Sequence, residues 1–93
     1  MHEDWRKITG DFETAKEREL WVREHADSYT VVRSLGPRRG YERIEVPDLA
    51  QAIDMAGRMA VEAGKAYMIY AVAGSLDAMV CYFDSEGNRH DAK

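Results

Sequence analysis

The clearest pattern of apolar positions along the chain predicts a helix at about residues 48–63. Apolar residues recur at helical spacing at Leu49, Ile53, Ala56, Ala60 and Ala63, which places them on one face. Asp48 precedes this run as a candidate N-cap, with Gln51 at the capping-box distance, and Gly64 follows it as a candidate C-cap. Because the face is mostly alanine and Gly57 lies beside it, we expect the helix to approach a sheet closely.

Two strands are predicted after this helix, at Ala66–Ala73 and Leu76–Phe83, joined by a Gly74-Ser75 turn of type II′. The two-residue loop predicts a register, because it fixes which residues face each other. One face would carry the pairs Ala73–Leu76, Ala71–Ala78, Ile69–Val80 and Tyr67–Tyr82, and the other would carry Val72–Asp77, Tyr70–Met79, Met68–Cys81 and Ala66–Phe83. The first face suits the alanine-rich helix. The second is also apolar, so we expect the N-terminal segment or another protein chain to cover it.

A second hairpin is predicted upstream, with strands Ser28–Leu35 and Tyr41–Val46 around a loop that contains two glycines and a proline. Residues 11–27 leave two alternatives open. A helix that starts at Asp11 and continues to Ala26 would put Trp21 opposite its apolar side. We favour the other alternative, a helix over residues 11–18 followed by a strand from about residue 19.

The expected order of elements is therefore α-β-β-β-α-β-β. It predicts an α+β fold with a single antiparallel sheet of four to five strands, the main helix 48–63 packed on one face, and a short N-terminal helix. A length of 93 residues is typical of one domain. We expect residues 1–83 to form that domain and the polar residues 84–93 to form a flexible C-terminal tail.

Composition narrows the class of protein. Apolar residues make up 45% of the chain and charged residues 32%, a balance typical of globular domains and unlike disordered ones. The longest apolar stretch, Ala66–Ala73, is too short to span a bilayer, and the N-terminus has no secretory signal pattern. The single cysteine, Cys81, excludes a disulfide or a cysteine-based zinc site within one chain. We expect a cytoplasmic location and no membrane partner.

The net charge of −4 is unevenly distributed. Residues 28–47 carry four arginines and two glutamates, whereas the segments on either side are acidic. The arginines are Arg33, Arg38, Arg39 and Arg43. They could bind phosphate groups or an acidic protein surface, but the overall acidity lacks the basic footprint of a nucleic-acid-binding protein.

No catalytic or metal-binding motif is present. The three histidines (His2, His25 and His90) have no partners at metal-ligand spacing. Cys81 has no base beside it in the expected register, and no glycine-rich phosphate-binding motif occurs. The sequence therefore predicts no catalytic residue, no metal and no cofactor.

The leading functional hypothesis is a small non-catalytic protein-binding domain that regulates or inhibits a partner protein in the manner of accessory or phage-encoded proteins, with a second copy of the chain, in a homodimer, as one candidate for the bound protein. The candidate interface residues are Met68, Tyr70, Met79, Phe83 and Trp21, a mixture typical of protein interfaces. The candidate polar rim or anion site comprises Arg33, Arg38, Arg39 and Arg43. Two alternatives remain: nucleic-acid binding through the arginine hairpin 33–43, and a small ligand-binding domain or enzyme with its site at a dimer interface.

Overall fold

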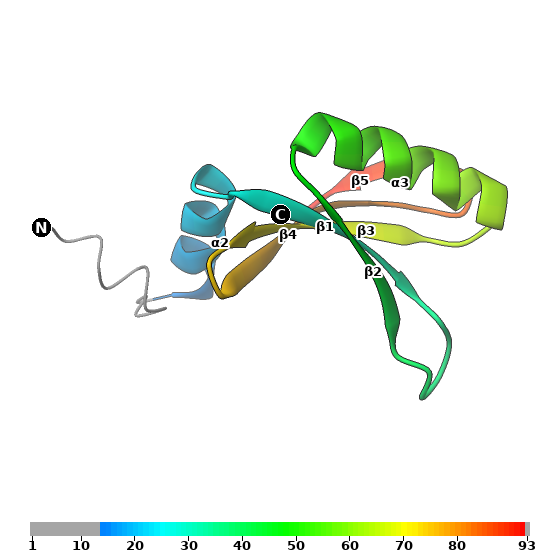
Figure 1. Cartoon of the computed structure of the whole chain (residues 1–93), viewed down its shortest axis with the longest axis horizontal. Coiled ribbons are helices and arrows are strands. Elements are labelled where there is room, and N and C mark those ends of the chain that lie inside the picture. The colour runs from blue at the N-terminus through cyan, green and yellow to red at the C-terminus, as the bar shows by residue number, and fades with distance from the viewer. Residues whose placement is uncertain (1–13, 93) are drawn as a thin grey trace, which may run out of the picture.

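Two helices lie on one face of a five-stranded antiparallel sheet in the computed structural model, which describes residues 14–92 (Figure 1). The elements in chain order are α2 (Ala15–Glu24), β1 (Ser28–Ser34), β2 (Tyr41–Val46), α3 (Leu49–Ala63), β3 (Tyr67–Ala73), β4 (Leu76–Phe83) and β5 (Arg89–Asp91). The strands lie side by side in the order β2-β1-β3-β4-β5. The expected α+β class and the single antiparallel sheet are confirmed.

Helix α3 begins and ends at the predicted residues. Asp48 is its N-cap, and its carboxylate accepts a hydrogen bond from the main-chain N–H of Gln51 at 2.8 Å. Gly64 is its C-cap in the left-handed conformation. The buried residues of α3 are Ala52, Ala56 and Ala60. Ala63, which the sequence pattern placed on the same face, is exposed at the end of the helix. The small side chains bring the helix close to the sheet: a Cβ atom added to Gly57 would lie 3.4 Å from the Phe83 ring.

Residues 19–24 continue helix α2, so the strand that the sequence favoured there is wrong and the helical alternative is correct. The N-cap is Thr14, whose hydroxyl accepts a hydrogen bond from the N–H of Glu17 at 3.0 Å. Helix α2 buries Val22 completely against Ala71, Ala73 and Ala78. The part of the expected N-terminal helix that precedes Thr14, with its candidate cap Asp11, lies outside the described residues.

The β3–β4 hairpin begins in the predicted register and then departs from it. Gly74 has a φ of 62°, as the first residue of a type II′ turn requires, and Tyr70 pairs with Met79 as expected. An irregularity between Ile69 and Tyr70 then shifts the pairing, so that Ile69 faces Cys81 rather than Val80. The extra residue turns the rest of β4 over, because successive strand residues point to opposite faces.

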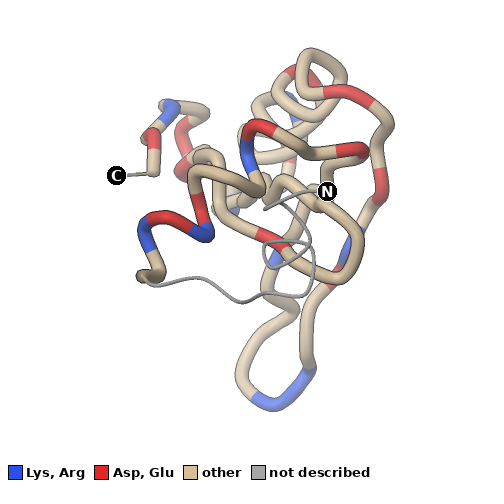
Figure 2. Tube along the Cα trace, turned by 90° about the vertical axis from the view of Figure 1, so that its left-hand side faces the viewer, with Lys and Arg blue, Asp and Glu red and all other residues tan. Residues whose placement is uncertain are grey.

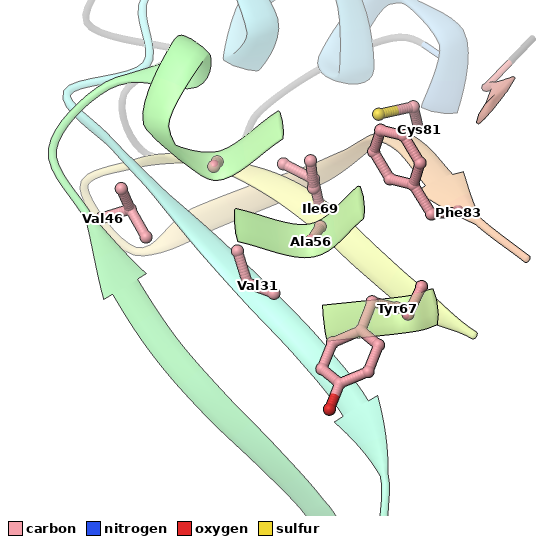
Figure 3. Close-up of a cluster of buried hydrophobic side chains, with 9 residues drawn as sticks. Val31, Val46, Ala56, Tyr67, Ile69, Cys81 and Phe83 are labelled. Atoms are coloured by element: carbon pink, nitrogen blue, oxygen red, sulfur yellow. The ribbon is translucent and has the colours of Figure 1, made fainter. Parts of the chain in front are cut away.

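The core lies between α3 and the sheet (Figure 3). Its buried members are Val31, Val46, Ala52, Ala56, Ala60, Tyr67, Ile69, Cys81 and Phe83. Cys81 and Phe83, which the expected register placed on the opposite face, point into this core because of the shift in β4. A smaller cluster around Val22 extends the buried layer under α2.

The C-terminal residues, expected as a frayed tail, form a turn and the fifth strand, β5, which pairs with β4 at Cys81, Tyr82 and Phe83. Asp84 organises the turn: its carboxylate accepts hydrogen bonds from the N–H groups of Glu86 and Asn88 and lies 2.9 Å from Nε2 of His90. The hydrogen bond with His90, followed by those from the main chain, lowers the pKa of Asp84 from 3.8 to about 2.

Candidate protein-binding surface

One face of the sheet is turned away from both described helices, and we call it the open face. The register assigns residues to it, since side chains alternate along each strand. Its members are Ser28, Thr30, Val32 and Ser34 of β1, Tyr41, Arg43 and Glu45 of β2, Met68, Tyr70 and Val72 of β3, Asp77, Met79 and Tyr82 of β4, and His90 of β5. Every helix-packed residue of these strands, such as Val31 and Ile69, belongs to the other face.

Apolar and aromatic side chains occupy the middle of the open face. Thr30 pairs with Tyr70, and Tyr70 pairs with Met79, which forms one row across three strands. Val32 and Met68 form a neighbouring row that continues to Tyr82. Most of these side chains are only half-buried, and Tyr82 is 37% exposed. Contacts within the face therefore leave much of the apolar surface in water.

A groove of about 360 Å³ runs along the open face between β2 and β4. Its lining residues are Thr30, Val32, Tyr41, Arg43, Met68, Tyr70, Val72 and Asp77. A groove of this volume with an apolar floor and a few polar groups at its edges suits a buried side chain of a partner.

Charged groups of both signs surround the apolar centre. The Arg43 guanidinium lies 5.9 Å from the centroid of the Tyr41 ring, a cation–π distance. Asp77 lies at the other end of the groove, and the ring of His90 stacks on Tyr82 with centroids 4.7 Å apart. The surface thus combines an apolar centre with a polar rim, as protein interfaces do.

The structure brings together three of the five predicted interface residues. Met68, Tyr70 and Met79 are neighbours on the open face. Phe83 is wrongly placed by the sequence prediction, because the shift in β4 buries its ring under α3. Trp21 lies on α2, where its ring stacks on His25 at 4.4 Å, and it packs against the Val22 cluster rather than beside Tyr70.

The sequence analysis missed several members of the open face. Val72 was placed on this face by the predicted Val72–Asp77 pair but was not chosen as an interface residue, and Val32 was not singled out, although the alternation of β1 contains its signal. Tyr82 replaces Phe83 on this face because of the shift in β4. No signal in the sequence points to this exchange, since Met79, Val80 and Cys81 are all apolar and fit either face.

The four arginines of the upstream hairpin do not converge on one surface. Arg33 lies on the helix-packed face, 3.4 Å from the Glu42 carboxylate and 5.7 Å from the Tyr67 ring centroid. Arg38 and Arg39 lie in the loop at the hairpin tip, which stands apart from the acidic segments in Figure 2. Arg43 lies on the open face.

A separate basic cleft of about 1060 Å³ lies where the hairpin loop, the end of α3 and the turn after β4 meet. Arg33, Arg39 and Lys65 contribute its positive charges, and Asp84 contributes a negative charge that already contacts His90. Lys65 is the member that the sequence analysis did not single out, since it lies outside the hairpin.

The thiol of Cys81 lies in the core of the described chain. Cys81 is fully buried, and desolvation raises the pKa of its thiol. Within residues 14–92, no group of three or more His, Cys, Asp or Glu side chains is arranged to hold a metal ion. No helix in the same range is long and apolar enough to cross a membrane.

Comparisons with known proteins give no relative from which a role could be transferred. No protein-family model, curated protein or solved structure matches the chain significantly. The function must therefore be argued from the surfaces of the chain itself.

Proposed function

We propose that this chain is a small non-catalytic protein-binding domain that holds a partner protein on the open face of its sheet and thereby regulates or blocks that partner. The observation that carries the proposal is the apolar centre of the open face, which both described helices leave uncovered. Antiparallel sheets commonly present one face to water, but that face is then mostly polar. An apolar face of this kind is typical of an interaction site.

The side chains on the open face favour a protein partner. Met68 and Met79 are flexible and adapt to the shape of an apolar surface. Tyr70 and Tyr82 combine a large apolar ring with a hydroxyl group, which makes tyrosine common at interfaces. The groove beside Tyr70 would accept an apolar or aromatic side chain of the partner, while Arg43 and Asp77 at its ends would pair with polar groups around it.

The charges on the open face argue against nucleic acid as its ligand. A ring platform for bases needs basic groups that neutralise the phosphate backbone. Among the residues assigned to the open face, Arg43 is the one arginine, and two carboxylates, Glu45 and Asp77, lie on the same face. The net charge there is not positive.

Affinity capture from an extract of the source organism, followed by binding measurements with the purified partner, tests the proposal. We expect Met79→Asp and Tyr70→Ser each to weaken binding at least about tenfold, as loss of a central interface side chain does. Leu20→Asp is the matched control, because Leu20 is an apolar residue of α2 that is 49% exposed away from the groove. A partner that binds both open-face variants as tightly as it binds the wild type would overturn the proposal, provided that circular dichroism shows the variants to be folded.

A second candidate function is the binding of phosphate groups of a nucleic acid at the basic cleft. It differs from the sequence-based alternative because the cleft uses Lys65 together with two arginines of the hairpin. The observation that favours it is that Lys65, Arg33 and Arg39, from separate parts of the fold, line the same cleft. Affinity for single- or double-stranded DNA or RNA would then fall steeply with salt and drop in an Arg39→Ala, Lys65→Ala double variant. Absence of binding at low salt would dismiss this candidate.

A further inference from the structure

Strand β2 lies at the edge of the sheet, with β1 on one side and no described strand on the other. The hydrogen bond from the N–H of Leu35 to the carbonyl of Gly40, at 3.0 Å, shows which of its main-chain groups face β1. Hydrogen-bonded pairs alternate along an antiparallel ladder. In the β1–β2 register, Glu42, Ile44 and Val46 therefore bond to β1, while Tyr41, Arg43 and Glu45 direct their N–H and C=O groups outward.

We propose that β2 pairs in antiparallel fashion with β2 of a second copy of this chain, with Arg43 of each copy opposite Glu45 of the other. This dimer forms through the main-chain groups of an edge strand and leaves the centre of the open face uncovered, although Arg43 also borders the groove there. An unpaired edge strand is a ready template for another strand, and the sequence of β2 selects the second copy as the occupant.

Only a few registers of self-pairing are compatible with the main chain. The outward-directed residues of one copy must face the outward-directed residues of the other, because otherwise the hydrogen bonds cannot form. Registers centred on Glu42, Arg43 or Glu45 would place two like charges directly opposite each other, which is destabilising. The register centred on Ile44 instead places Arg43 opposite Glu45 twice, and both side chains of each pair lie on the open face.

The other positions are compatible with the register centred on Ile44. The two Ile44 side chains meet on the helix-packed face, next to the apolar core. Tyr41, which is 56% exposed, would face Pro47 of the second copy, and because proline has no N–H to donate, the regular ladder would end at this pair. Glu42 would face Val46, and the charge of Glu42 is already matched by Arg33 of its own chain at 3.4 Å.

Charged residues on an edge strand can also serve to prevent pairing. That role is best filled by charges of one sign or by charges that point inward. Here Arg43 and Glu45, whose main-chain groups are directed outward, carry opposite charges two residues apart on the open face, so the pattern complements itself. Neither Arg43 nor Glu45 forms an ion pair within the described part of its own chain, so both remain available.

The pairing would join the two sheets into a continuous ten-stranded sheet, five strands from each copy. The two-fold axis of such a pair is perpendicular to the sheet, so both open faces lie on the same side. The dimer would therefore present two grooves on one extended surface, and a partner with two matching segments would bind it with the gain of avidity.

Sedimentation velocity on the full chain tests the pairing, over concentrations from about 10 μM to about 1 mM, where small interfaces assemble. We expect a reversible dimer that Arg43→Glu and Glu45→Arg each weaken by about tenfold or more, since each places like charges in opposition. The double variant, Arg43→Glu with Glu45→Arg, should restore the dimer. The control Arg39→Glu makes the same charge change at the hairpin tip and should leave the dimer unchanged.

A cross-linking experiment tests the register directly. In the proposed pair the two Ile44 residues form a non-hydrogen-bonded pair, whose Cα separation of about 4.5 Å suits a disulfide. Mild oxidation with diamide should therefore cross-link the Ile44→Cys variant into a dimer much faster than the Arg43→Cys or Glu45→Cys variant. The native Cys81 is buried, so it should not contribute to the cross-link.

A chain that stays monomeric throughout the concentration range would overturn the proposal. A dimer that survives both single charge reversals, or that links fastest through position 43 or 45, would overturn it as well.

Discussion

The guanidinium group of Arg23 donates two hydrogen bonds to the main-chain carbonyl of Met79, from Nη2 at 2.7 Å and from Nε at 2.9 Å. The two residues are 56 positions apart in the sequence. Met79 immediately precedes the shift in β4, where the ladder with β3 is irregular, and a carbonyl at such a site loses its regular strand partner. Arg23 therefore satisfies that carbonyl and ties helix α2 to the strand that bends beneath it.

We expect Arg23→Met to lower the free energy of unfolding by about 1.5–3 kcal/mol, because charged hydrogen bonds contribute that much and the Met79 carbonyl would be left without a partner. Methionine keeps most of the apolar stem of arginine, so the loss reports on the hydrogen bonds and on the partly exposed ion pair of Arg23 with Glu19 at 3.5 Å. Chemical denaturation followed by circular dichroism measures the change.

Arg58→Met is the matched control for this substitution. Arg58 forms its ion pair with Asp54 on the exposed side of α3, where solvent screening leaves such a pair with little effect on stability. Equal losses in the two variants would contradict the role assigned to Arg23.

The shift in β4 also explains why the sequence predicted one part of the open face and not the rest. Near the turn, the Gly74-Ser75 loop fixes the register, and Tyr70 and Met79 were correctly placed together. Beyond Met79, every residue to Phe83 is apolar or aromatic, so alternation gives no sign of an inserted residue. Contacts with Arg23 and with α3 decide the outcome, and neither is encoded locally.

Residues 19–24 were misjudged for a related reason. Leu20, Trp21 and Val22 fit a strand or a helix about equally well by local pattern. The helix is favoured because Ala71, Ala73 and Ala78 leave room on the sheet for Val22. That preference depends on residues about fifty positions away, whereas α3 carries its own caps and periodicity and was predicted almost to the residue.

The close approach of α3 to β4 predicts opposite effects for two substitutions of Gly57. Gly57→Ala should stabilise the protein by about 0.5–1 kcal/mol, because alanine favours the helix and its Cβ would touch the Phe83 ring at 3.4 Å, an ordinary contact distance. Gly57→Val should destabilise it by about 1–3 kcal/mol, because the added methyl groups overlap that ring. Thermal unfolding of both variants provides the comparison, and a stable Gly57→Val variant would show that α3 is not held at this distance.

The burial of Cys81 predicts a thiol that reacts only when the protein opens. Its side chain is fully buried, and desolvation raises the pKa of the thiol, which reduces the fraction of reactive thiolate. At pH 7, the thiol of Cys81 should react with an aromatic disulfide reagent at least about a hundredfold more slowly in the native protein than in protein unfolded by urea. Destabilising variants such as Arg23→Met should increase the native labelling rate. Fast labelling of the native wild type would contradict the buried position of Cys81.

The turn after β4 predicts a loss of stability in acid that depends on Asp84. The hydrogen bond with His90, supported by main-chain donors, holds the pKa of Asp84 at about 2, below its ordinary 3.8. In the unfolded chain Asp84 takes up a proton near its ordinary pKa, so between about pH 4 and pH 2 the unfolded state binds more protons. The stabilisation from Asp84 is therefore complete above that range and is lost as the pH falls through it.

We expect Asp84→Asn to remove part of the fall in unfolding free energy between pH 4 and pH 2. His90→Ala should reduce the same fall by a smaller amount, because the main-chain donors Asn88 and Glu86 remain. Urea unfolding of the three proteins at a series of pH values measures the slopes, and an unchanged slope in Asp84→Asn would show that the turn does not depend on this carboxylate.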